Sequence, residues 1–481
     1  MTGLREALFW MLVLCLSYLV LVTSLYMLQL PLAFAEQRRR KREREARSGV
    51  PVRPGVSIVV AAYNEEATIV ATLNACLEQL YPRFEVIVVN DGSTDRMMDV
   101  LRSRFELEPC MWHPPAVALE TRLVRNVYRS KIDPRIIVVD KANGGKADAL
   151  NCGANVAREP YVVGVDADTV LSDVALARGM EPFDDPDVVG LTSYLSITGS
   201  PRRARFLRGA KLVDRSLLIS FQHLDYVRSF HNSRLAWSRL NYMLCTNGAF
   251  QIWRREVMIE LGGFSSDFTC EDIEFTFRVH EHFRRVGLPY RVVCIPDEVG
   301  ATEGPQRARS LIAQRARWQR VILETFWHYR YMLGRRRYGT VGLLGMPFYL
   351  FSEVLAPVFE QLAIAMLPLA VVAHRLSWHA ALLVMGAIAL SNGVLTTAAL
   401  AIADQGDRSY RKRDLARLAA LAPLELFWYR PILTWARIKG TWGWMRGDRG
   451  WDKFERNVTT AVPPASTETP QQSRVTAVIS A

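Results

Sequence analysis

The sequence predicts an α/β protein in which a doubly wound domain lies between apolar, membrane-spanning helices at the two ends of the chain. Half of its 481 residues are hydrophobic, and the longest apolar runs lie near the two ends. Between them, four short apolar runs alternate with helical patterns, which favours a parallel sheet. Each of the four runs ends in a polar or acidic residue. These observations exclude a disordered or fibrous protein and argue against a purely soluble one.

The first apolar run, residues 7–35, contains no charged residue. At a rise of about 1.5 Å per residue it exceeds the roughly 30 Å core of a bilayer, so we expect a spanning helix. A cleaved signal peptide is the alternative, but the run is longer than a typical signal core and lacks a convincing cleavage site. Basic residues follow from Arg38 to Arg47. They place this end of the helix in the cytoplasm and the N-terminus outside.

Two further spans are expected at about 341–373 and 377–403, joined by a short external link. Basic residues between Arg408 and Arg413 then return to the cytoplasmic side, in agreement with that orientation. A third stretch, about 416–436, is interrupted by two prolines and by charged residues. It is a broken span, a re-entrant hairpin or an interfacial helix, so we expect three or four spans in all.

Charge and cysteine content narrow the class of partner. The net charge is +12, and the basic runs flank the apolar segments. This arrangement favours anionic lipid headgroups over nucleic acid, for which there is no motif. The seven cysteines are scattered and form no CxxC pair. We therefore expect reduced thiols facing the cytosol, without a disulfide framework or zinc ribbon.

The central segment contains the runs of the predicted sheet. These runs are short and rich in Val and Ile, as strands buried on both faces are, and they cover residues 56–63, 84–89, 135–139 and 161–165. Helical patterns at about 66–80, 94–106 and 145–157 separate them. The order predicts a parallel, doubly wound sheet.

Polar residues stand at the end of every predicted strand. The first is followed by Asn64 and Glu65, the next two by Asp91 and Asp140, and the last by Asp166 and Asp168. Capping of helices and loops explains any one of these acids, but four in succession are harder to explain that way. Ligands of open α/β sheets bind at the carboxyl ends of the strands. We therefore expect a crevice lined with carboxylates.

The Asp166-Ala167-Asp168 segment is the sharpest local signal. Side chains two residues apart on an extended segment share a face, so both carboxylates can reach one divalent ion. Mg²⁺ and Mn²⁺ prefer oxygen ligands, often completed by substrate phosphates. The pattern predicts a Mg²⁺ or Mn²⁺ site.

A glycine turn, Gly144-Gly145, follows the third strand and opens a helix at Lys146. Glycine permits a close backbone approach, and a helix N-terminus with a lysine favours an anion. Ordinary loop chemistry gives the same pattern. Beside the carboxylates, we interpret the turn as facing a phosphate.

Three later segments carry further candidate residues. Thr246-Asn247-Gly248 precedes a strand at 249–253, and Thr269–Asp272 opens a helix that runs to about Arg285. The helix dipole alone can account for acids in a first turn, but a carboxylate there can also act as a base if it faces the crevice. Gln314, Arg317 and Trp318 share one face of a basic, aromatic helix at about 307–333. That helix also fits an interfacial helix with snorkelling arginines and tryptophan anchors.

Together these motifs resemble the membrane-integrated family 2 glycosyltransferases, in particular the processive synthases of chitin oligosaccharide, hyaluronan, cellulose and poly-N-acetylglucosamine. The matching segments occur in the family's order: AAYNEE (61–66), VVNDGSTD (88–95), NGGKADALN (143–151), DAD (166–168), TNGAF (246–250), ED (271–272) and QRARW (314–318). The resemblance covers roughly residues 54–330. CEDIEFTFRV and WDKFER favour the poly-N-acetylglucosamine synthase type.

The resemblance implies a Rossmann-like nucleotide-sugar domain and an inverting transfer, with a role for each matching residue. Tyr63, Glu65 and Asp91 would hold the uridine, Lys146 would contribute to the nucleotide pocket, Asp166 would lie near the UDP, and Asp168 would ligate the metal. Asp272 would be the general base. The donor and acceptor pocket would comprise Thr246, Asn247, Gly248, Glu271, Gln314, Arg317 and Trp318. Two positions depart from the family's usual residues: Cys270, often Thr, and Val321, often Gly.

The chain is thus expected to divide into six segments: a transmembrane helix (1–36), a basic cytosolic linker (37–53), a cytosolic glycosyltransferase domain (54–305), an amphipathic interfacial region (306–338), C-terminal transmembrane and interfacial helices (339–438), and a cytosolic segment with a disordered tail (439–481). We expect a multi-pass protein of a bacterial inner (plasma) membrane with a cytoplasmic catalytic domain. A control module appended after the last apolar segment is not expected, whereas an accessory export or regulatory subunit remains open.

Three functions compete. The first is a processive synthase that transfers N-acetylglucosamine or glucose from a UDP-sugar to a β-linked polysaccharide and exports it. The second is a non-processive enzyme acting on a lipid or short oligosaccharide. The third is a non-enzymatic nucleotide-sugar sensor, against which the intact Asp91, Asp166, Asp168, Asp272 and Arg317 argue.

Overall fold

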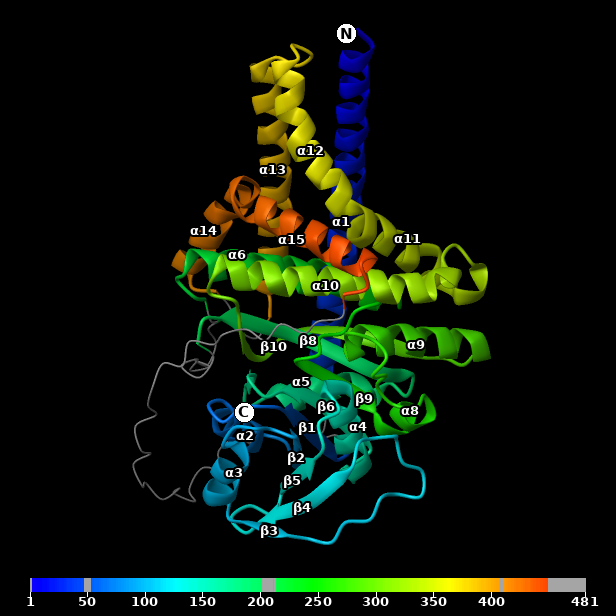
Figure 1. The fold of residues 1–481 in the computed structure, drawn as a ribbon, viewed down its shortest axis with the longest axis vertical. Coiled ribbons are helices and arrows are strands. Elements are labelled where there is room, and N and C mark those ends of the chain that lie inside the picture. Colours follow the sequence, from blue (N-terminus) through cyan, green and yellow to red (C-terminus); the bar gives the residue numbers. More distant parts are fainter. Residues whose placement is uncertain (1, 47–52, 201–210, 212, 407–409, 449–481) are drawn as a thin grey trace. The chain divides into compact units, whose positions relative to one another are not determined.

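The computed structural model describes residues 2–46, 53–200, 211, 213–406 and 410–448, and it has a single mixed sheet at the centre of its lower domain (Figure 1). The sheet has ten strands in the order β3-β4-β5-β2-β1-β6-β9-β8-β10-β7. The strands are β1 (Val56–Ala62), β2 (Phe84–Asp91), β3 (Leu107–Pro109), β4 (Val124–Ser130), β5 (Ile136–Lys141), β6 (Tyr161–Asp166), β7 (Val170–Leu171), β8 (Val188–Thr198), β9 (Phe250–Arg254) and β10 (Arg291–Glu303).

The predicted parallel strands form one half of this sheet. In the order β5-β2-β1-β6, each strand pairs in parallel with its neighbour, and the four elements coincide with the four apolar runs. The register places Asp91 opposite Lys141 and Ala61 opposite Asp166. The polar residues that end these strands therefore meet at one edge, as expected for a doubly wound α/β sheet.

The other half of the sheet was not predicted. Strand β9 pairs antiparallel with β6 and with β8, β10 runs parallel to β8, and β7 pairs antiparallel with β10. On the far side, β4 is antiparallel to β5. The sheet is therefore mixed rather than purely parallel. Strand β8 is buried along its whole length although it contains Ser and Thr as well as apolar residues, which is why no apolar run marked it.

Helices cover both faces of the sheet. On one face, Ile58 and Val60 of β1 pack in a cluster with residues of α2, α3 and α5, and on the other face Val59 packs in a cluster with residues of α4 and α9. This alternation follows from the two-residue period of a strand. The helices are α2 (Ile69–Leu77), α3 (Met97–Phe105), α4 (Lys146–Val156), α5 (Ala175–Met180), α6 (Leu217–Arg228), α7 (Leu235–Arg239), α8 (Arg255–Glu260) and α9 (Glu271–Val286), with the short segments η1 (Glu181–Asp184) and η3 (Ser229–Arg234).

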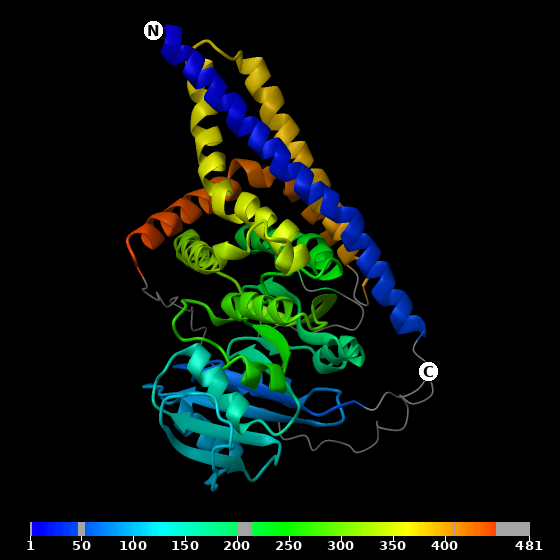
Figure 2. The same cartoon turned by 90° about the vertical axis from the view of Figure 1, so that its right-hand side faces the viewer.

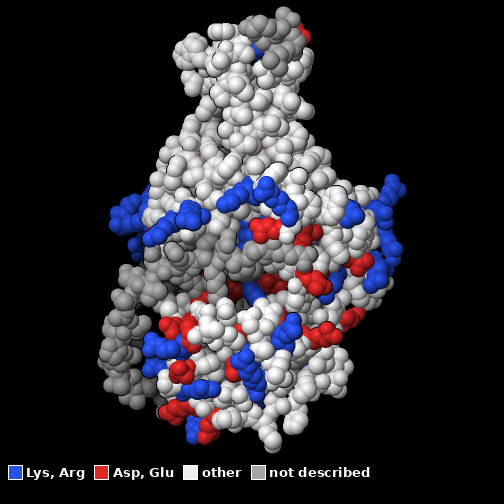
Figure 3. All heavy atoms as spheres, viewed as in Figure 1, with Lys and Arg blue, Asp and Glu red and all other residues white. Residues whose placement is uncertain are grey.

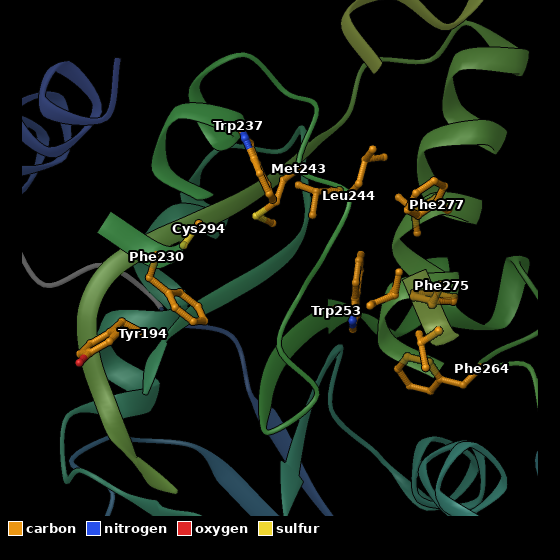
Figure 4. Packing of buried hydrophobic residues seen from close by; sticks show 14 of the residues in the cluster. Tyr194, Phe230, Trp237, Met243, Leu244, Trp253, Phe264, Phe275, Phe277 and Cys294 are labelled. Atoms are coloured by element: carbon orange, nitrogen blue, oxygen red, sulfur yellow. The ribbon is translucent and has the colours of Figure 1, made fainter. Parts of the chain in front are cut away.

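An aromatic cluster fixes helix α9 beside the sheet. Figure 4 shows Phe275 pointing toward Trp253 of β9 and Phe264. The rings of Trp253 and Phe275 meet edge to face with centroids 4.8 Å apart, and Phe264 lies 4.9 Å from Phe275. Trp253 and Phe275 are fully or almost fully buried. Because buried aromatic pairs contribute strongly to packing, this cluster holds the first turn of α9, with Glu271 and Asp272, near the end of β6.

Three helical stretches are long and apolar enough to cross a membrane within the described part of the chain: residues 6–46, 341–372 and 378–403. They belong to α1 (Thr2–Ala46), to a stretch made of η6 (Val341–Gly345), α11 (Met346–Tyr349), η7 (Leu350–Leu355) and α12 (Ala356–Val372), and to α13 (Trp378–Ala403). Figures 1 and 2 show α1, α12 and α13 rising together. Long apolar helices are therefore present at the three places expected from the sequence, and each is a candidate membrane span.

Helix α1 extends further than the sequence suggested. We expected a linker to begin at residue 37, but the helix continues to Ala46. Glu36 is fully buried and pairs with Arg39 and Arg40, while Arg44 lies 3.0 Å from both Glu181 and Asp297. The pairs of Glu36 lie within the helix and support its basic turns, and the pairs of Arg44 dock the end of α1 onto the sheet domain.

The interrupted third stretch is folded as two helices with a 3₁₀ segment between them. They are α14 (Lys412–Leu421), η8 (Ala422–Phe427) and α15 (Tyr429–Met445). In Figure 1, α15 crosses below the apolar helices, and it packs on α10 (Ala308–Tyr329). A side chain at Gly440 would come within 2.2 Å of the Ala316 carbonyl oxygen, so the crossing needs glycine. The choice among a broken span, a re-entrant hairpin and an interfacial helix stays a prediction for this stretch.

The short segments η4 (Arg330–Met332) and η5 (Arg336–Tyr338) follow α10. Figure 3 shows a mostly uncharged upper part and, below it, a band of Lys and Arg side chains. This distribution suits a boundary between lipid tails and headgroups. The tail expected to be disordered lies outside the described residues.

Candidate active site

The Asp-Ala-Asp segment lies at the carboxyl end of β6, in the middle of the sheet. Asp166 is the last residue of β6, and Asp168 lies in the turn that follows, where the Thr169 N–H donates to the Asp166 carbonyl oxygen at 3.0 Å. Ala167 between them is buried and both acids are half-buried, so a shared metal site stays a prediction. Burial raises the pKa of Asp166, Lys146 opposes this effect, and the charge of Asp168 adds to it. The two carboxylates are therefore close enough to repel each other.

Lys146 connects this segment to two others. Its Nζ lies 2.7 Å from Asp166 Oδ1 and 2.9 Å from Glu271 Oε1, and it donates a hydrogen bond of 3.2 Å to the Gly248 carbonyl oxygen. One ammonium group thus joins the end of β6, the turn before β9 and the first turn of α9. We call Lys146, Asp166, Gly248, Glu271 and Asp272 the reaction cluster.

Asp272 is held in place by three donors. Its Oδ2 accepts from the Gly248 backbone N–H at 2.7 Å, and its Oδ1 accepts from the Ile273 N–H at 2.7 Å and from the Cys270 thiol at 3.0 Å. Burial raises its pKa, the neighbouring Glu271 charge adds to this, and Lys146 opposes it. A carboxylate with a raised pKa in a fixed orientation has the properties of a general base.

Cys270 takes part in the site through this hydrogen bond. Burial and the charges of Asp272 and Glu271 raise the pKa of its thiol well above the usual value. The thiol therefore stays protonated and remains a donor to Asp272. The sequence marked Cys270 only as a departure from the family's usual Thr.

Two of the three residues of the Thr246-Asn247-Gly248 turn contact Asp272: the Thr246 hydroxyl donates to its carbonyl oxygen at 3.2 Å, and Gly248 contacts its carboxylate. Gly248 does so through its backbone, and a side chain there would come within 2.9 Å of both Asp272 Oδ2 and Lys146 Nζ. Asn247 is half-buried, and its Oδ1 accepts from the Ala249 N–H. Thr246 is 1% exposed and its hydroxyl meets Thr276 Oγ1 at 3.0 Å. Its hydroxyl therefore fastens the turn to α9, and a place for Thr246 in the donor and acceptor pocket stays a prediction.

The α10 face approaches the reaction cluster through Arg317. Burial lowers the pKa of Arg317, and the nearby charges of Asp166 and Glu271 counteract this, so the guanidinium lies near these acids. Trp318 packs differently, under the guanidinium of Arg315 at 4.2 Å and 6.4 Å from the ring of Tyr226. Gln314 is half-buried on the same helix, and its role stays a prediction.

The residues expected to hold the uridine lie at the ends of β1 and β2. The turns after these strands are joined, because the Asn64 N–H donates to Ser93 Oγ and Asn64 Oδ1 accepts from the Thr94 N–H. Glu65 accepts from the Thr68 hydroxyl at 2.6 Å. Tyr63 and Glu65 are both half-buried, so their role as uridine ligands stays a prediction.

Asp91 is engaged by the protein itself. It is 3% exposed and accepts from Lys141 Nζ at 2.6 Å, from the Gly144 N–H at 2.9 Å and from the Gly145 N–H at 2.8 Å. The glycine turn therefore points its amides at Asp91, which corrects the expectation that the turn faces a phosphate. No sequence pattern marked Lys141 as a site residue. Its position opposite Asp91 in the parallel register of β2 and β5 reveals its role.

The residues of the Asp166–Asp168 pair fit a hard divalent cation. Their donors are carboxylate oxygens, which Mg²⁺ and Mn²⁺ prefer, and the repulsion between the two acids is what a cation would relieve. Within the described residues there is no group of three or more His, Cys, Asp or Glu that could hold a metal ion. The remaining ligands would have to come from a bound phosphate or from water.

A cavity of about 490 Å³ opens beside the turn that carries Cys270 and Asp272. Its wall includes Thr269, Arg320 and Glu324, and aromatic side chains of Trp327 and Trp444. The Thr269 N–H donates to Glu324 at 3.0 Å, so the turn is tied to α10. Figure 3 shows acidic and basic side chains meeting in the hollow between the basic band and the lower domain.

Two family models match the chain. The model described as glycosyl transferase family 2 matches residues 57–114, and the one described as glycosyl transferase family group 2 matches residues 161–391. The two matches include most of the sheet and the reaction cluster except Lys146.

Curated relatives are poly-beta-1,6-N-acetyl-D-glucosamine synthases. The protein from Staphylococcus epidermidis is 27% identical over 281 residues, and that from Staphylococcus aureus strain COL is 25% identical over 281 residues. In each case the match covers 57% of this chain and 57% of the relative, so the chain aligns with little more than half the length of these proteins.

Among solved structures, the mannosyltransferase PcManGT from Pyrobaculum calidifontis, in complex with GDP-Man and Mn²⁺, is similar with a TM-score of 0.53. It is 20% identical, and the match covers 90% of this chain and 99% of that one. This likeness shows a shared fold.

Proposed function

Because the chain belongs to glycosyltransferase family 2, we propose that it transfers a sugar from a UDP-sugar donor to a hydroxyl group of an acceptor, with inversion at the anomeric carbon. The reaction cluster carries this proposal. It joins one basic and three acidic side chains at the carboxyl edge of the parallel half of the sheet, where nucleotides bind in such folds. The N-acetylglucosamine synthases among the relatives support N-acetylglucosamine as the donor sugar, with glucose as the other candidate.

Asp272 would accept the proton. As the acceptor hydroxyl loses its proton to Oδ2 of Asp272, its oxygen attacks the anomeric carbon, and the bond from that carbon to the diphosphate oxygen breaks with its electron pair leaving on UDP. The hydrogen bonds from Gly248, Ile273 and Cys270 keep the carboxylate in one orientation. Such fixed geometry reduces the entropy lost on reaching the transition state.

Lys146 and Arg317 would stabilise the leaving UDP. Lys146 pairs with Asp166 and Glu271, and the charges of the same two acids act on Arg317. Fixed positive charges near a developing negative charge are among the largest contributions to catalysis. Asp166 and Asp168 would hold a divalent ion, which supplies charge neutralisation to the diphosphate when bound.

The membrane helices support a second part of the proposal. A polysaccharide made at this site, below the apolar helices, would leave through them, so we propose processive synthesis coupled to export. We propose that the basic band lies against anionic lipid headgroups, with the sheet domain on the cytoplasmic face of a bacterial inner membrane, and that an accessory export or regulatory subunit could act with it. Non-processive transfer to a lipid or short oligosaccharide is the alternative; no described residue decides between them.

The test is UDP release by the detergent-purified protein across a panel of UDP-sugars, with Mg²⁺, with Mn²⁺ and with a chelator. We expect turnover with one donor, its loss in the chelator, and a product whose size distribution is measured by gel filtration. Long products without intermediates would support processivity, and short ones would support the alternative.

Two results would contradict the proposal. Turnover unaffected by chelation would exclude the metal role of Asp166 and Asp168. UDP binding without turnover on any donor, in a reconstituted membrane as well as in detergent, would favour a nucleotide-sugar sensor.

A further inference from the structure

A second lysine, Lys141, is enclosed between two carboxylates away from the reaction cluster. Its side chain is fully buried, and its Nζ lies 2.6 Å from Asp91 Oδ1 and 2.5 Å from Asp148 Oδ1. It also donates to the Ala142 carbonyl oxygen at 2.6 Å. A buried ammonium of this kind needs such partners, and each acid would be left buried without a counter-charge if the lysine were removed.

The two acids attach to different structural elements. Asp91 ends β2 and accepts from the N–H groups of Gly144 and Gly145, while Asn143 donates to the Asp91 carbonyl oxygen at 2.7 Å. Asp148 lies in the first turn of α4, and its Oδ2 accepts from the Arg122 N–H at 2.8 Å. Lys141 itself ends β5. The three side chains therefore fasten two strands and the start of a helix together.

The glycine turn between Lys141 and α4 has little freedom. Gly145 has φ +88°, which side-chain-bearing residues rarely adopt, and a side chain at Gly144 would come within 2.5 Å of Asp148. The next residue is Lys146, whose Nζ reaches Asp166 and Glu271. The position of Lys146 is thus set by the turn, and the turn is set by the three buried side chains.

We propose that Lys141, Asp91 and Asp148 form a buried charge lock that positions Lys146 in the reaction cluster. Lys141 is a positioning residue: it is 0% exposed and cannot touch a ligand. Asp91 acts in the same way, through the turn, rather than as a direct ligand of the nucleotide base. The effect on the reaction rests on the proposed function; the lock itself does not.

Hydrogen exchange tests the lock independently of activity. Amide exchange of the peptide covering residues 141–150 is measured in four full-length proteins: the wild type, Lys141→Met, Asp148→Asn and Lys131→Met. Lys131 is an exposed lysine paired with Glu108, so its variant is the control. We expect the Gly144 and Gly145 amides to be protected in the wild type and in Lys131→Met, and to exchange faster in Lys141→Met and Asp148→Asn. Equal exchange in all four proteins would overturn the lock.

A double-mutant cycle tests its connection to Lys146. We expect Lys141→Met to weaken UDP affinity, measured by calorimetry, by about tenfold, as outer partners of a site do. In a Lys146→Met background the same change should have less than about a twofold effect, because residues that act as one unit are not additive. Lys141→Arg should recover part of the affinity.

The outcomes separate the two proposals. Equal losses in both backgrounds would show that Lys141 supports the fold only, and would overturn the positioning role. No change in UDP affinity in a folded Lys141→Met protein would do the same. If the wild type fails to bind UDP, the proposed function fails, and the exchange experiment still decides whether the lock exists.

Discussion

Two lysines five residues apart, Lys141 and Lys146, each lie between two carboxylates, but their surroundings differ. The side chain of Lys141 is 0% exposed and its partners Asp91 and Asp148 are 5% and 10% exposed. The side chain of Lys146 is 25% exposed and that of Asp166 is 34% exposed. A lysine between two carboxylates therefore occurs twice, once in a closed site that is buried in the protein and once at an open, partly exposed edge of the sheet.

The difference separates a structural role from a chemical one. In the closed site every charged group is satisfied by the protein, so the site can hold the shape of the turn and nothing else. At the open edge, Lys146 can exchange a carboxylate partner for an anionic ligand, and Asp272 keeps a raised pKa beside it. Perturbed carboxylates next to an accessible cation are typical of functional sites.

The largest effect is expected from Lys146→Met. Losing the cation that faces Asp166 and Glu271 should lower kcat/KM for the UDP-sugar on the order of 10²- to 10³-fold, as loss of one preorganised charge-stabilising group does. Lys131→Met is the control, because Lys131 is exposed and pairs only with Glu108 among the described ion pairs. Equal kcat/KM values for Lys146→Met and the wild type would contradict a chemical role for Lys146, and with it the proposed difference between the two lysines.

Gly248→Ala should lower kcat by about 10²-fold, with a smaller effect on UDP affinity. The new methyl group would stand within 2.9 Å of Asp272 Oδ2 and Lys146 Nζ, and a displacement of about 1 Å at a catalytic group can have this effect. Gly386→Ala, where a side chain meets nothing within 4 Å, is the matched control. Steady-state kinetics of the three proteins checks this expectation; unchanged kcat in Gly248→Ala would mean that the cluster tolerates the shift.

Glu271→Gln should move the acidic limb of the pH–rate profile to lower pH. A base is active when deprotonated, so activity is lost as the pH falls through the pKa of Asp272. Burial and the Glu271 charge raise that pKa, and removing the charge lowers it. The measurement is kcat/KM against pH for both proteins. A limb that stays in place, or moves to higher pH, would argue against Asp272 as the titrating base.

A smaller effect is expected in the acetylation of lysines by an amine-reactive reagent. Burial works against the charged form of Lys146, but the charges of Asp166, Glu271 and Asp272 raise its pKa well above the usual value. It should therefore react more slowly than exposed Lys131 and faster than buried Lys141, and UDP should slow it further. Mass spectrometry of the labelled peptides gives the order. Faster labelling of Lys141 than of Lys146 would contradict the conclusion that Lys141 is buried and Lys146 is accessible.

The sequence predicted the parts of the fold that depend on local pattern. Four apolar runs predicted the parallel strands, and the acids at their ends predicted the edge of the sheet where Asp166 now pairs with Lys146. The antiparallel half of the sheet was not predicted, because β8 is buried by tertiary packing and is not marked by an apolar run. The continuation of α1 to Ala46 was also not predicted, because it depends on tertiary contacts: Arg44 pairs with Glu181 and Asp297, which are distant in sequence.

Within the site, residue type was easier to predict than direction. Lys146 and Asp166 were expected near a ligand, and both lie in the cluster. The glycine turn was expected to face a phosphate, but its amides donate to Asp91, while the hydroxyl of Thr246 is bonded to Thr276. Only the three-dimensional register, which sets Asp91 opposite Lys141, shows why.

The most direct test of the account is a single-turnover comparison of the wild type with Asp272→Asn. Rapid mixing of the membrane-reconstituted protein with its UDP-sugar and acceptor measures the chemical step, and calorimetry measures UDP affinity in parallel. If Asp272 is the base, the variant should bind UDP as the wild type does and lose the chemical step by on the order of 10²- to 10⁴-fold. Transfer at the wild-type rate by a variant that binds UDP normally would contradict the account.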